Sequence, residues 1–167
     1  MYDIMVTRLT CEDSDPSLMA IASCTTRSLN RTTKSHNITA ATAPNVTLNE
    51  IFIKVTFHMR INTGYRRLIA EVEENFCGFL NGTAKSLLIS MMWPFLRTHS
   101  NLDHKCPFFG NFYVRDFIIK FDNLPPALPE GQGRVIVHVR NGRKRVSIMK
   151  IQVLLEIKPK GAATLNF

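Results

Sequence analysis

The histidines and acidic residues that could do chemistry stand close together in one polar stretch. His99 and His104 come just before Cys106, and Asp103 directly precedes His104. Such residues could bind a metal ion or form an acid–histidine dyad. Their spacing matches no common zinc pattern, and no motif places a nucleophile beside the dyad. We therefore predict neither a metal site nor a catalytic dyad in this stretch.

An acidic cluster formed by Glu71, Glu73 and Glu74 is the other candidate for catalysis. A catalytic pair of carboxylates needs two surroundings that push their pKa values apart. Alternation along the chain instead sends Glu71 and Glu73 to the same outward face of a strand, which predicts solvated side chains. The sequence also lacks a glycine-rich phosphate loop, a G-x-S-x-G elbow and an H-E-x-x-H helix. These features predict a protein that is not an enzyme and uses no cofactor.

The cysteines indicate a compartment. Cys11, Cys24, Cys77 and Cys106 are even in number and widely spaced, without a C-x-x-C motif. The absence of that motif argues against redox and zinc-ribbon chemistry, and four cysteines allow three disulfide pairings. Two disulfides in an oxidising compartment are therefore predicted.

Asparagine sequons point the same way. Asn30, Asn37, Asn45 and Asn81 each begin an N-x-Thr pattern, and three of them lie in the Thr-rich stretch 30–47. In a secreted protein they predict glycosylated surface, and the alternative is that the stretch is a polar loop and a strand edge. No apolar signal-peptide segment precedes Cys11, so an extracellular location requires a signal peptide that is not visible in this chain.

The charge of the chain is +8, from 21 Lys and Arg against 13 Asp and Glu. Such a charge suits nucleic acid, anionic glycans or an acidic membrane surface. The basic residues are dispersed, apart from Arg140 and residues 143–145, which bracket the hairpin signal Asn141-Gly142. Zinc-finger spacing and aromatic RNA-binding motifs are absent. We predict a basic hairpin tip that could meet an anionic glycan, and no nucleic-acid partner.

The elements that must position these residues are mostly strands. Residues 50–61 alternate between apolar and polar side chains, which predicts a half-buried antiparallel strand with His58 on the solvent side. A turn at 62–64 joins it to a second strand. The predicted strands that follow the first are 65–73, 112–121, 134–140 and 146–157, the last two joined at the Asn141-Gly142 turn.

Residues 83–99 are the exception, because their apolar residues recur at helical spacing. Asn81 or Thr83 could cap this helix, and Pro94 would kink or end it. The pattern predicts one mainly β domain, an antiparallel β-sandwich with one helix near residues 83–98. The length of 167 residues fits a single domain, and no apolar run approaches the ~18–20 residues that cross a membrane.

Several short segments together carry a family resemblance. They are Ser28–Lys34 after Cys24, Gly64-Tyr65, Cys77–Leu80, Ser100–Pro107 and Leu128–Gly131. In this order, over about residues 7–157, they resemble a large insect family of secreted proteins classed as domain of unknown function 1091. That family is similar to the lipid-recognition (ML) superfamily. Departures occur at Glu74 and Asn75, where the family usually has an apolar residue and an aspartate, and at Gly133, where it usually has an aromatic residue.

The resemblance implies an immunoglobulin-like, ML-like β-sandwich over residues 11–158, with tails at 1–10 and 159–167. It implies disulfides Cys11–Cys24 and Cys77–Cys106. By superfamily analogy it implies a cavity between the sheets for a lipid or another small hydrophobic ligand, with a link to chemosensation in some relatives. The residues expected to line that cavity are Ile53, Val55, Phe57, Phe117, Ile119, Phe121, Val137 and Val153.

Two functions remain open on these grounds. One is a secreted carrier of a hydrophobic ligand. The other is an extracellular interaction or receptor-accessory module with a filled core, whose basic tip meets a membrane receptor or an anionic glycan.

Overall fold

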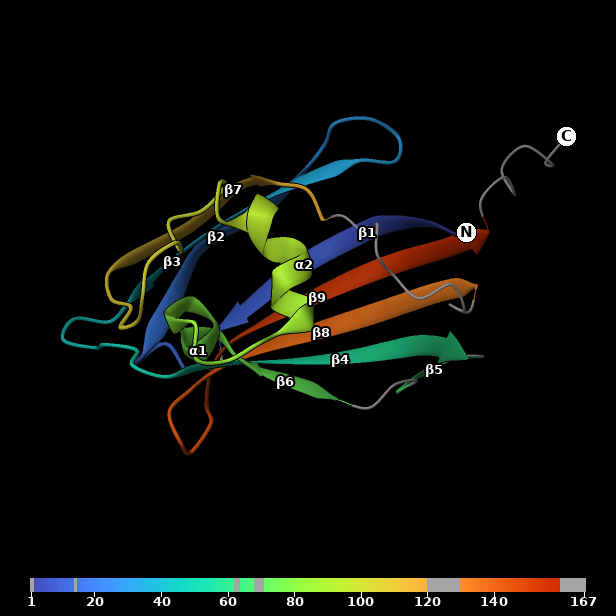
Figure 1. The fold of residues 1–167 in the computed structure, drawn as a ribbon. Helices are drawn as coiled ribbons and strands as arrows, with labels where there is room; N and C mark the ends of the chain where they lie inside the picture. The colour runs from blue at the N-terminus through green and yellow to red at the C-terminus, as the bar shows by residue number, and fades with distance from the viewer. Residues whose placement is uncertain (1, 14, 62–63, 68–70, 120–129, 160–167) are drawn as a thin grey trace, which may run out of the picture.

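A computed structural model describes residues 2–13, 15–61, 64–67, 71–119 and 130–159 of the chain. Nearly all of the described chain lies in or beside two antiparallel sheets (Figure 1). The large sheet has the order β1-β9-β8-β4-β5, and β6 also pairs with β4. Its strands are β1 (Tyr2–Asp13), β4 (Ile51–Ile61), β5 (Gly64–Arg67), β6 (Val72–Asn75), β8 (Gly131–Asn141) and β9 (Val146–Pro159). The small sheet has the order β2-β3-β7, from β2 (Met19–Ser28), β3 (Lys34–Thr42) and β7 (Asn111–Phe117). The mainly β fold class is therefore confirmed.

The helix predicted near residues 83–98 is present, and a second short helix precedes it. They are α1 (Phe76–Asn81) and α2 (Leu87–Leu96). The cap of α2 is Ser86, whose Oγ accepts a hydrogen bond from the Ile89 amide at 3.0 Å, and not Asn81 or Thr83. Pro94 lies inside α2, one turn or less from its end. The prediction missed α1 because six residues are too short for helical periodicity to show.

The departure at Asn75 has a structural role in starting α1. Its Oδ1 accepts a hydrogen bond from the Gly78 amide at 2.9 Å, so Asn75 caps the helix in the way an aspartate would. Gly82 ends the helix in the left-handed region with φ of 78°. Asn75 and Gly82 thus set the start and the end of α1, the short helix between β6 and α2.

The N-terminal segment corrects a second prediction. Of the segment 1–10, which was expected to be a tail, residues 2–10 instead supply most of β1, which pairs with β9 from Tyr2↔Pro159 to Asp13↔Met149. β1 lies at an edge of the large sheet, where charged and polar side chains dilute the apolar alternation. The expected C-terminal tail falls outside the described residues except for Pro159, which ends β9.

Two predicted strands have different bounds in the structure. The strand predicted over 65–73 is β5 and β6, which pair with different parts of β4. The strand predicted over 112–121 ends as β7 at Phe117, directly after Asp116 adopts φ of 52°.

The predicted β8–β9 hairpin is present, with its turn at Gly142–Arg145. Gly142 has φ of 77°, which suits glycine, and the Arg145 amide donates to the Gly142 carbonyl at 3.0 Å. A bulge then shifts the register between Val139 and Arg140, opposite Ile148, which is completely buried.

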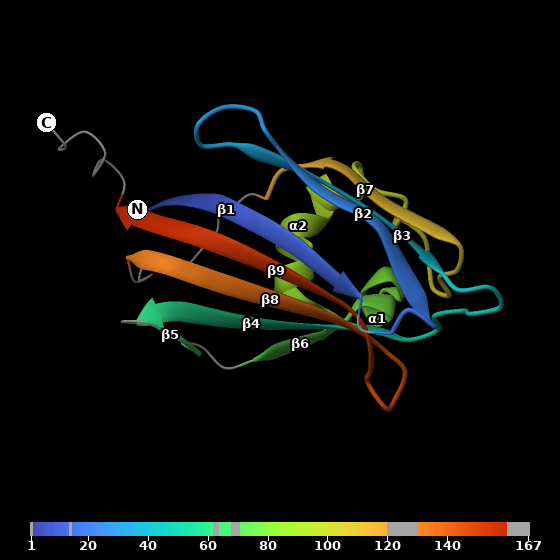
Figure 2. The same ribbon diagram turned by 180° about the vertical axis from the view of Figure 1, so that it is seen from behind.

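The two sheets form two layers that are closest at one end. In Figures 1 and 2 the ribbons converge beside α1 and diverge toward the end where the N-terminus lies. α2 stands between the diverging ribbons on one side of the molecule. We call the region around α1 the closed end and the region around the start of β1 the open end.

Candidate functional site

The inward face of the large sheet is apolar across four neighbouring strands. Phe57 on β4 lies opposite Val135 on β8, which lies opposite Val153 on β9, which in turn lies opposite Leu9 on β1. Paired residues of antiparallel strands share one side of the sheet, so these four side chains form one row. The neighbouring rows repeat the pattern; one of them contains Val55, Val137 and Ile151.

Most of this apolar face is only half-buried. The side chains that face the small sheet but keep partial exposure are Ile53, Val55, Phe57, Val135, Val137, Val139, Met149 and Ile151. An apolar face turned into a two-layer fold is normally covered completely, because covering it is the main favourable term in folding. The small sheet, with three strands against six, covers this face incompletely.

The structure distributes the predicted cavity residues over different surroundings. Ile53 packs against the cluster at the closed end, whereas Phe57 and Ile119 pack with Val153 at the open end. Phe117 is buried, and its ring lies 5.5 Å from that of Phe95 on α2. Val55 and Val137 face each other in the sheet between these groups. Phe121 lies outside the described residues.

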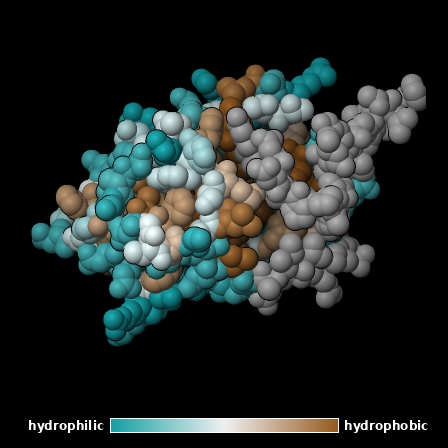
Figure 3. All heavy atoms as spheres, viewed as in Figure 1, coloured by the Kyte–Doolittle hydropathy of each residue, from teal (hydrophilic) through white to brown (hydrophobic). Residues whose placement is uncertain are grey.

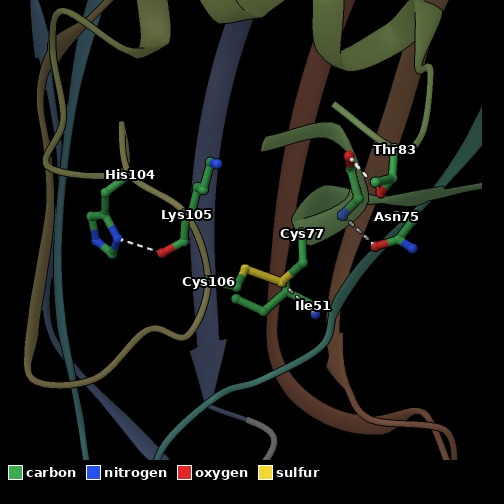
Figure 4. The surroundings of a disulfide bond; sticks show 8 residues. Ile51, Asn75, Cys77, Thr83, His104, Lys105 and Cys106 are labelled. Atoms are coloured by element: carbon green, nitrogen blue, oxygen red, sulfur yellow. Dashed lines mark hydrogen bonds between the residues drawn. A yellow bond between two sulfur atoms is a disulfide. The ribbon is translucent and has the colours of Figure 1, made fainter. Parts of the chain in front are cut away.

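The closed end is tightly packed around the disulfide Cys77–Cys106 (Figure 4). Cys77 is buried, and its Sγ accepts a hydrogen bond from the Ile51 amide at 3.2 Å. Phe108 is 1% exposed and stacks on Phe76 with ring centroids 6.0 Å apart. The structure therefore contains the bridge that the resemblance implied, and it joins α1 to the loop before β7.

The second bridge, Cys11–Cys24, links β1 of the large sheet to β2 of the small sheet. The Lys34 ammonium donates to the Thr7 carbonyl at 2.9 Å, which also connects the two sheets. These two contacts tie the sheets together along the β1–β2 edge. The opposite side, where α2 stands, has no such covalent link among the described residues.

His36 is a buried polar residue that the sequence analysis did not single out. It is 1% exposed, it lies opposite Phe117, and its Nδ1 shares a hydrogen bond of 3.0 Å with the Thr26 hydroxyl. Burial, and secondarily the charge of Lys34, lowers the pKa of His36 from its ordinary value, so the ring is neutral near pH 7. Its Nε2 has no hydrogen-bond partner among the described residues. The apolar Ile38 and Ala40, which continue at a spacing of two, were the signal for this inward face.

The outer face of the large sheet is polar and basic. The pKa of His138 is lowered by partial burial, and further by Arg140, Lys150 and Lys54. Lys54 forms an ion pair with Glu71 at 2.6 Å. His58, expected in solvent, is half-buried on this face.

The basic hairpin tip is smaller than predicted. The Arg145 guanidinium bonds Glu73 at 2.9 Å and lies 3.4 Å from the centroid of the Phe52 ring. Glu71 and Glu73 thus face outward as predicted, but in ion pairs rather than simply solvated. Arg143 and Lys144 remain exposed at the tip.

The histidines near Cys106 are engaged separately. The His99 ring stacks on Phe95 at 4.0 Å, and His104 packs on Phe108 at 4.3 Å and points away from the disulfide (Figure 4). Asp103 lies 3.8 Å from Arg97. Within the described ranges, no three His, Cys, Asp or Glu residues gather in a way that could hold a metal ion.

Two hollows open on the surface, and neither is lined by a predicted cavity residue. One, of about 490 Å³, lies between α1 and α2 and is lined by Phe79, Gly82, Ala84, Lys85, Ser86, Leu87 and Ser90. The other, of about 350 Å³, lies at the end of β3 beside Phe109.

The glycosylation sequons lie in different surroundings. Asn30, Asn45 and Asn81 are exposed. Asn37 is half-buried in β3, and its Oδ1 accepts a hydrogen bond from the Asp116 amide at 3.1 Å. Glycosylation at these positions remains a prediction.

Gly133, where the family usually has an aromatic residue, lies in β8 inside the sheet rather than at an edge. A Cβ at this position would lie 3.3 Å from ring atoms of Phe57. The Phe57 ring therefore occupies space beside the missing side chain.

Comparisons with known proteins give a fold likeness and a family. One solved structure, chicken MD-1 complexed with lipid IVa, is 16% identical, with a TM-score of 0.42, and the match covers 93% of this chain and 98% of that chain. At this score the two folds are only loosely alike, so the ligand of chicken MD-1 carries no argument here. No curated protein matches the sequence. Of the described helices, neither is long and apolar enough to cross a membrane.

The family comparison is decisive. A family model described as "Protein of unknown function (DUF1091)" matches residues 52–135, from β4 through both helices and β7 into β8. This range contains both cysteines of the closed end, Cys77 and Cys106, and the inward-facing residues of β4 from Ile53 onward. The chain belongs to the DUF1091 family.

Proposed function

We propose that this chain is a secreted, non-enzymatic protein that binds a lipid or another small hydrophobic ligand between its two sheets. The observation that supports this best is the half-buried apolar face of the large sheet. Ile53, Val55 and Phe57 on β4 and Val135 and Val137 on β8 all point inward and all keep partial exposure.

The energetics favour an apolar ligand at this place. Each Å² of apolar surface removed from water contributes about 25 cal/mol, before the costs of association. The closed end has already gained this energy, since Leu48, Phe108 and Ile148 are at most 2% exposed. At the open end Leu155 and Ile157 are also buried, at 4% and 1% exposed, but Phe57 stays half-buried. An apolar molecule that covers the half-buried side chains would gain the energy that the small sheet leaves available.

Uptake of a fluorescent fatty acid, with native mass spectrometry of the secreted protein, tests this proposal. Val137→Trp adds a large side chain in the middle of the inward face and should lower uptake at least tenfold. Leu154→Trp is the matched control, because Leu154 is half-buried in the same sheet on the outer face. Equal uptake by both variants, or no uptake and no co-purified ligand in the parent, would refute ligand binding between the sheets.

Secretion is part of the same proposal. Two disulfides persist in oxidising compartments and are rare in the cytosol, and three sequons are exposed. Expression behind a signal sequence should give glycosylated protein with both bridges, whereas a cytosolic protein would have reduced thiols and no glycans. A chemosensory role would follow if the bound ligand is an external apolar cue.

The exposed pair Arg143 and Lys144 favours one alternative function, an interaction module whose hairpin tip meets an anionic glycan or an acidic receptor surface. Heparin affinity with steep salt dependence, lost in an Arg143→Ala/Lys144→Ala variant and kept in Arg145→Ala, would support it. The second variant is the control because Arg145 is held by Glu73.

A further inference from the structure

The outward face of α2 is apolar where a surface helix normally carries polar side chains. Its exposed positions are Leu87, Ser90, Met91 and Pro94, at the i, i+3, i+4, i+7 spacing of one helix face. Leu87 is 79% exposed and Met91 36%. The Ser90 hydroxyl, the one polar group of this stripe, donates back to the Ser86 carbonyl within the helix.

The opposite face of α2 already has its partners. Ile89 is buried in the closed-end cluster, and the Trp93 ring meets Phe76 and Phe79 at 5.8 Å each. Core packing therefore accounts for Ile89 and Trp93 but not for Leu87 and Met91. Figure 3 shows apolar atoms gathered in the middle of the face that carries α2.

Two basic residues flank this stripe in the sequence. Between Asn75 and Leu102 the only charged residues are Lys85, just before α2, and Arg97, just after it. Lys85 lies on the wall of the hollow between α1 and α2, and it forms no ion pair or hydrogen bond with the described residues. Arg97 lies 3.8 Å from Asp103, so among the described residues Lys85 carries the unpaired charge beside the stripe. An apolar helix face with a lysine at its start is complementary to a surface that is apolar inside and anionic at its boundary.

We propose that α2 docks this protein on anionic lipid membranes, with Leu87 and Met91 inserted among the acyl chains and Lys85 beside a lipid phosphate. The hollow between the helices has Phe79, Ala84 and Leu87 in its wall, which gives an apolar space next to that ammonium. This inference goes beyond ligand binding between the sheets and does not depend on it. Leu87 and Met91 are exposed to solvent and lie outside the space between the sheets.

Flotation with phosphatidylcholine vesicles, with and without phosphatidylserine, tests the proposal on the glycosylated, disulfide-bonded protein. We expect binding to the phosphatidylserine vesicles that weakens with salt. Leu87→Gln should lower the partition coefficient about tenfold, as expected for one large apolar side chain. Lys85→Glu should lower it for anionic vesicles while leaving phosphatidylcholine vesicles unaffected.

The matched control is Phe109→Gln, because Phe109 is an equally apolar, 70% exposed side chain that lines the other hollow, beside Ala43 and Pro44. Binding that persists in Leu87→Gln, or that falls equally in Phe109→Gln, would overturn the proposal. A third result would also overturn it: the protein is a dimer in light scattering, the dimer binds no vesicles, and Leu87→Gln dissociates it. In that case a second copy of the chain would cover the stripe. Fatty-acid uptake should be unchanged in Leu87→Gln, so failure of membrane docking and failure of ligand binding are separately visible.

Discussion

The closed and open ends of the space between the sheets are built from similar apolar residues and are covered to different extents. At the closed end, side chains from β2, β3, β4, β9, α1, α2 and two loops converge, and Phe108 and Ile148 are at most 1% exposed. At the open end the cluster comes mainly from β1, β4, β8 and β9 of one sheet, and Phe57 and Val135 stay half-buried although Ile157 is 1% exposed. The comparison indicates that strands cover part of the apolar face and that loops and helices complete the cover at the closed end.

The sealing at the closed end depends on irregular segments. Leu48 and Phe108, both in loops, exchange two backbone hydrogen bonds of 2.8 and 2.9 Å and lie at the centre of the cluster. The bridge Cys77–Cys106 holds the second of these loops to α1. The closed end is therefore the part of the molecule that we expect to supply most of its stability.

The largest expected effect is the loss of stability when a core aromatic side chain is truncated at each end. Phe108→Ala should lower the free energy of unfolding by about 3–5 kcal/mol, because it empties a fully buried aromatic site. Phe57→Ala at the open end should cost only about 1–2 kcal/mol, because that ring is half-buried. Urea unfolding followed by circular dichroism measures both. Equal losses would show that the two ends are packed alike and would remove the basis of the comparison.

Removing each disulfide is the next test. The bridges close loops of sequence separation 29 and 13, for which the chain-entropy model gives about 3.6 and 2.9 kcal/mol. Cys77→Ala/Cys106→Ala should therefore destabilise the protein more than Cys11→Ala/Cys24→Ala. The gap between the two variants should exceed the gap between the two chain-entropy values, because Cys77 is also buried. Thermal unfolding under non-reducing conditions compares the two variants. A larger loss in the second would indicate that the β1–β2 link, not the closed end, dominates stability.

A smaller effect is expected where the β8–β9 hairpin is fixed to β6 beside the closed end. Arg145→Ala removes the bond to Glu73 and the contact with the Phe52 ring, and should cost about 0.5–1 kcal/mol. Arg143→Ala, at an exposed position of the same turn, should change stability by less than about 0.5 kcal/mol. Indistinguishable midpoints in urea would mean that the Arg145 contacts contribute nothing measurable.

The smallest expected effect is a pH dependence from His36, on the inward side of the small sheet. Because the pKa of His36 is lower in the folded protein, the unfolded chain takes up a proton first as the pH falls below 6.5. Stability should thus be complete above pH 6.5 and decrease on acidification, until the folded ring also protonates. His36→Gln should flatten this part of the profile, compared by urea midpoints at pH 7.5 and 5.5. His138→Gln, at a more exposed ring on the outer face, is the control with a weaker change.

Sequence patterns predicted the elements whose alternation is unbroken. β4, β8 and β9 were found with close bounds because Ile53, Val55 and Phe57 on one strand, and Val135 and Val137 on the next, repeat at a spacing of two. The hairpin turn at Gly142 was visible for the same reason, since an Asn-Gly pair favours positive φ. β1 was missed because an edge strand tolerates polar residues on both faces, and α1 because six residues span less than two turns.

The sequence by itself determined which residues face inward and that four cysteines form bridges, because side-chain period and thiol count are local properties of the chain. Only the tertiary structure decided how far each inward side chain is covered, which separates Phe108 from Phe57, although both are apolar aromatic residues. It also decided that Leu87 faces solvent and that His36 does not. Burial depends on how elements distant in the sequence come together, and no local pattern carries that information.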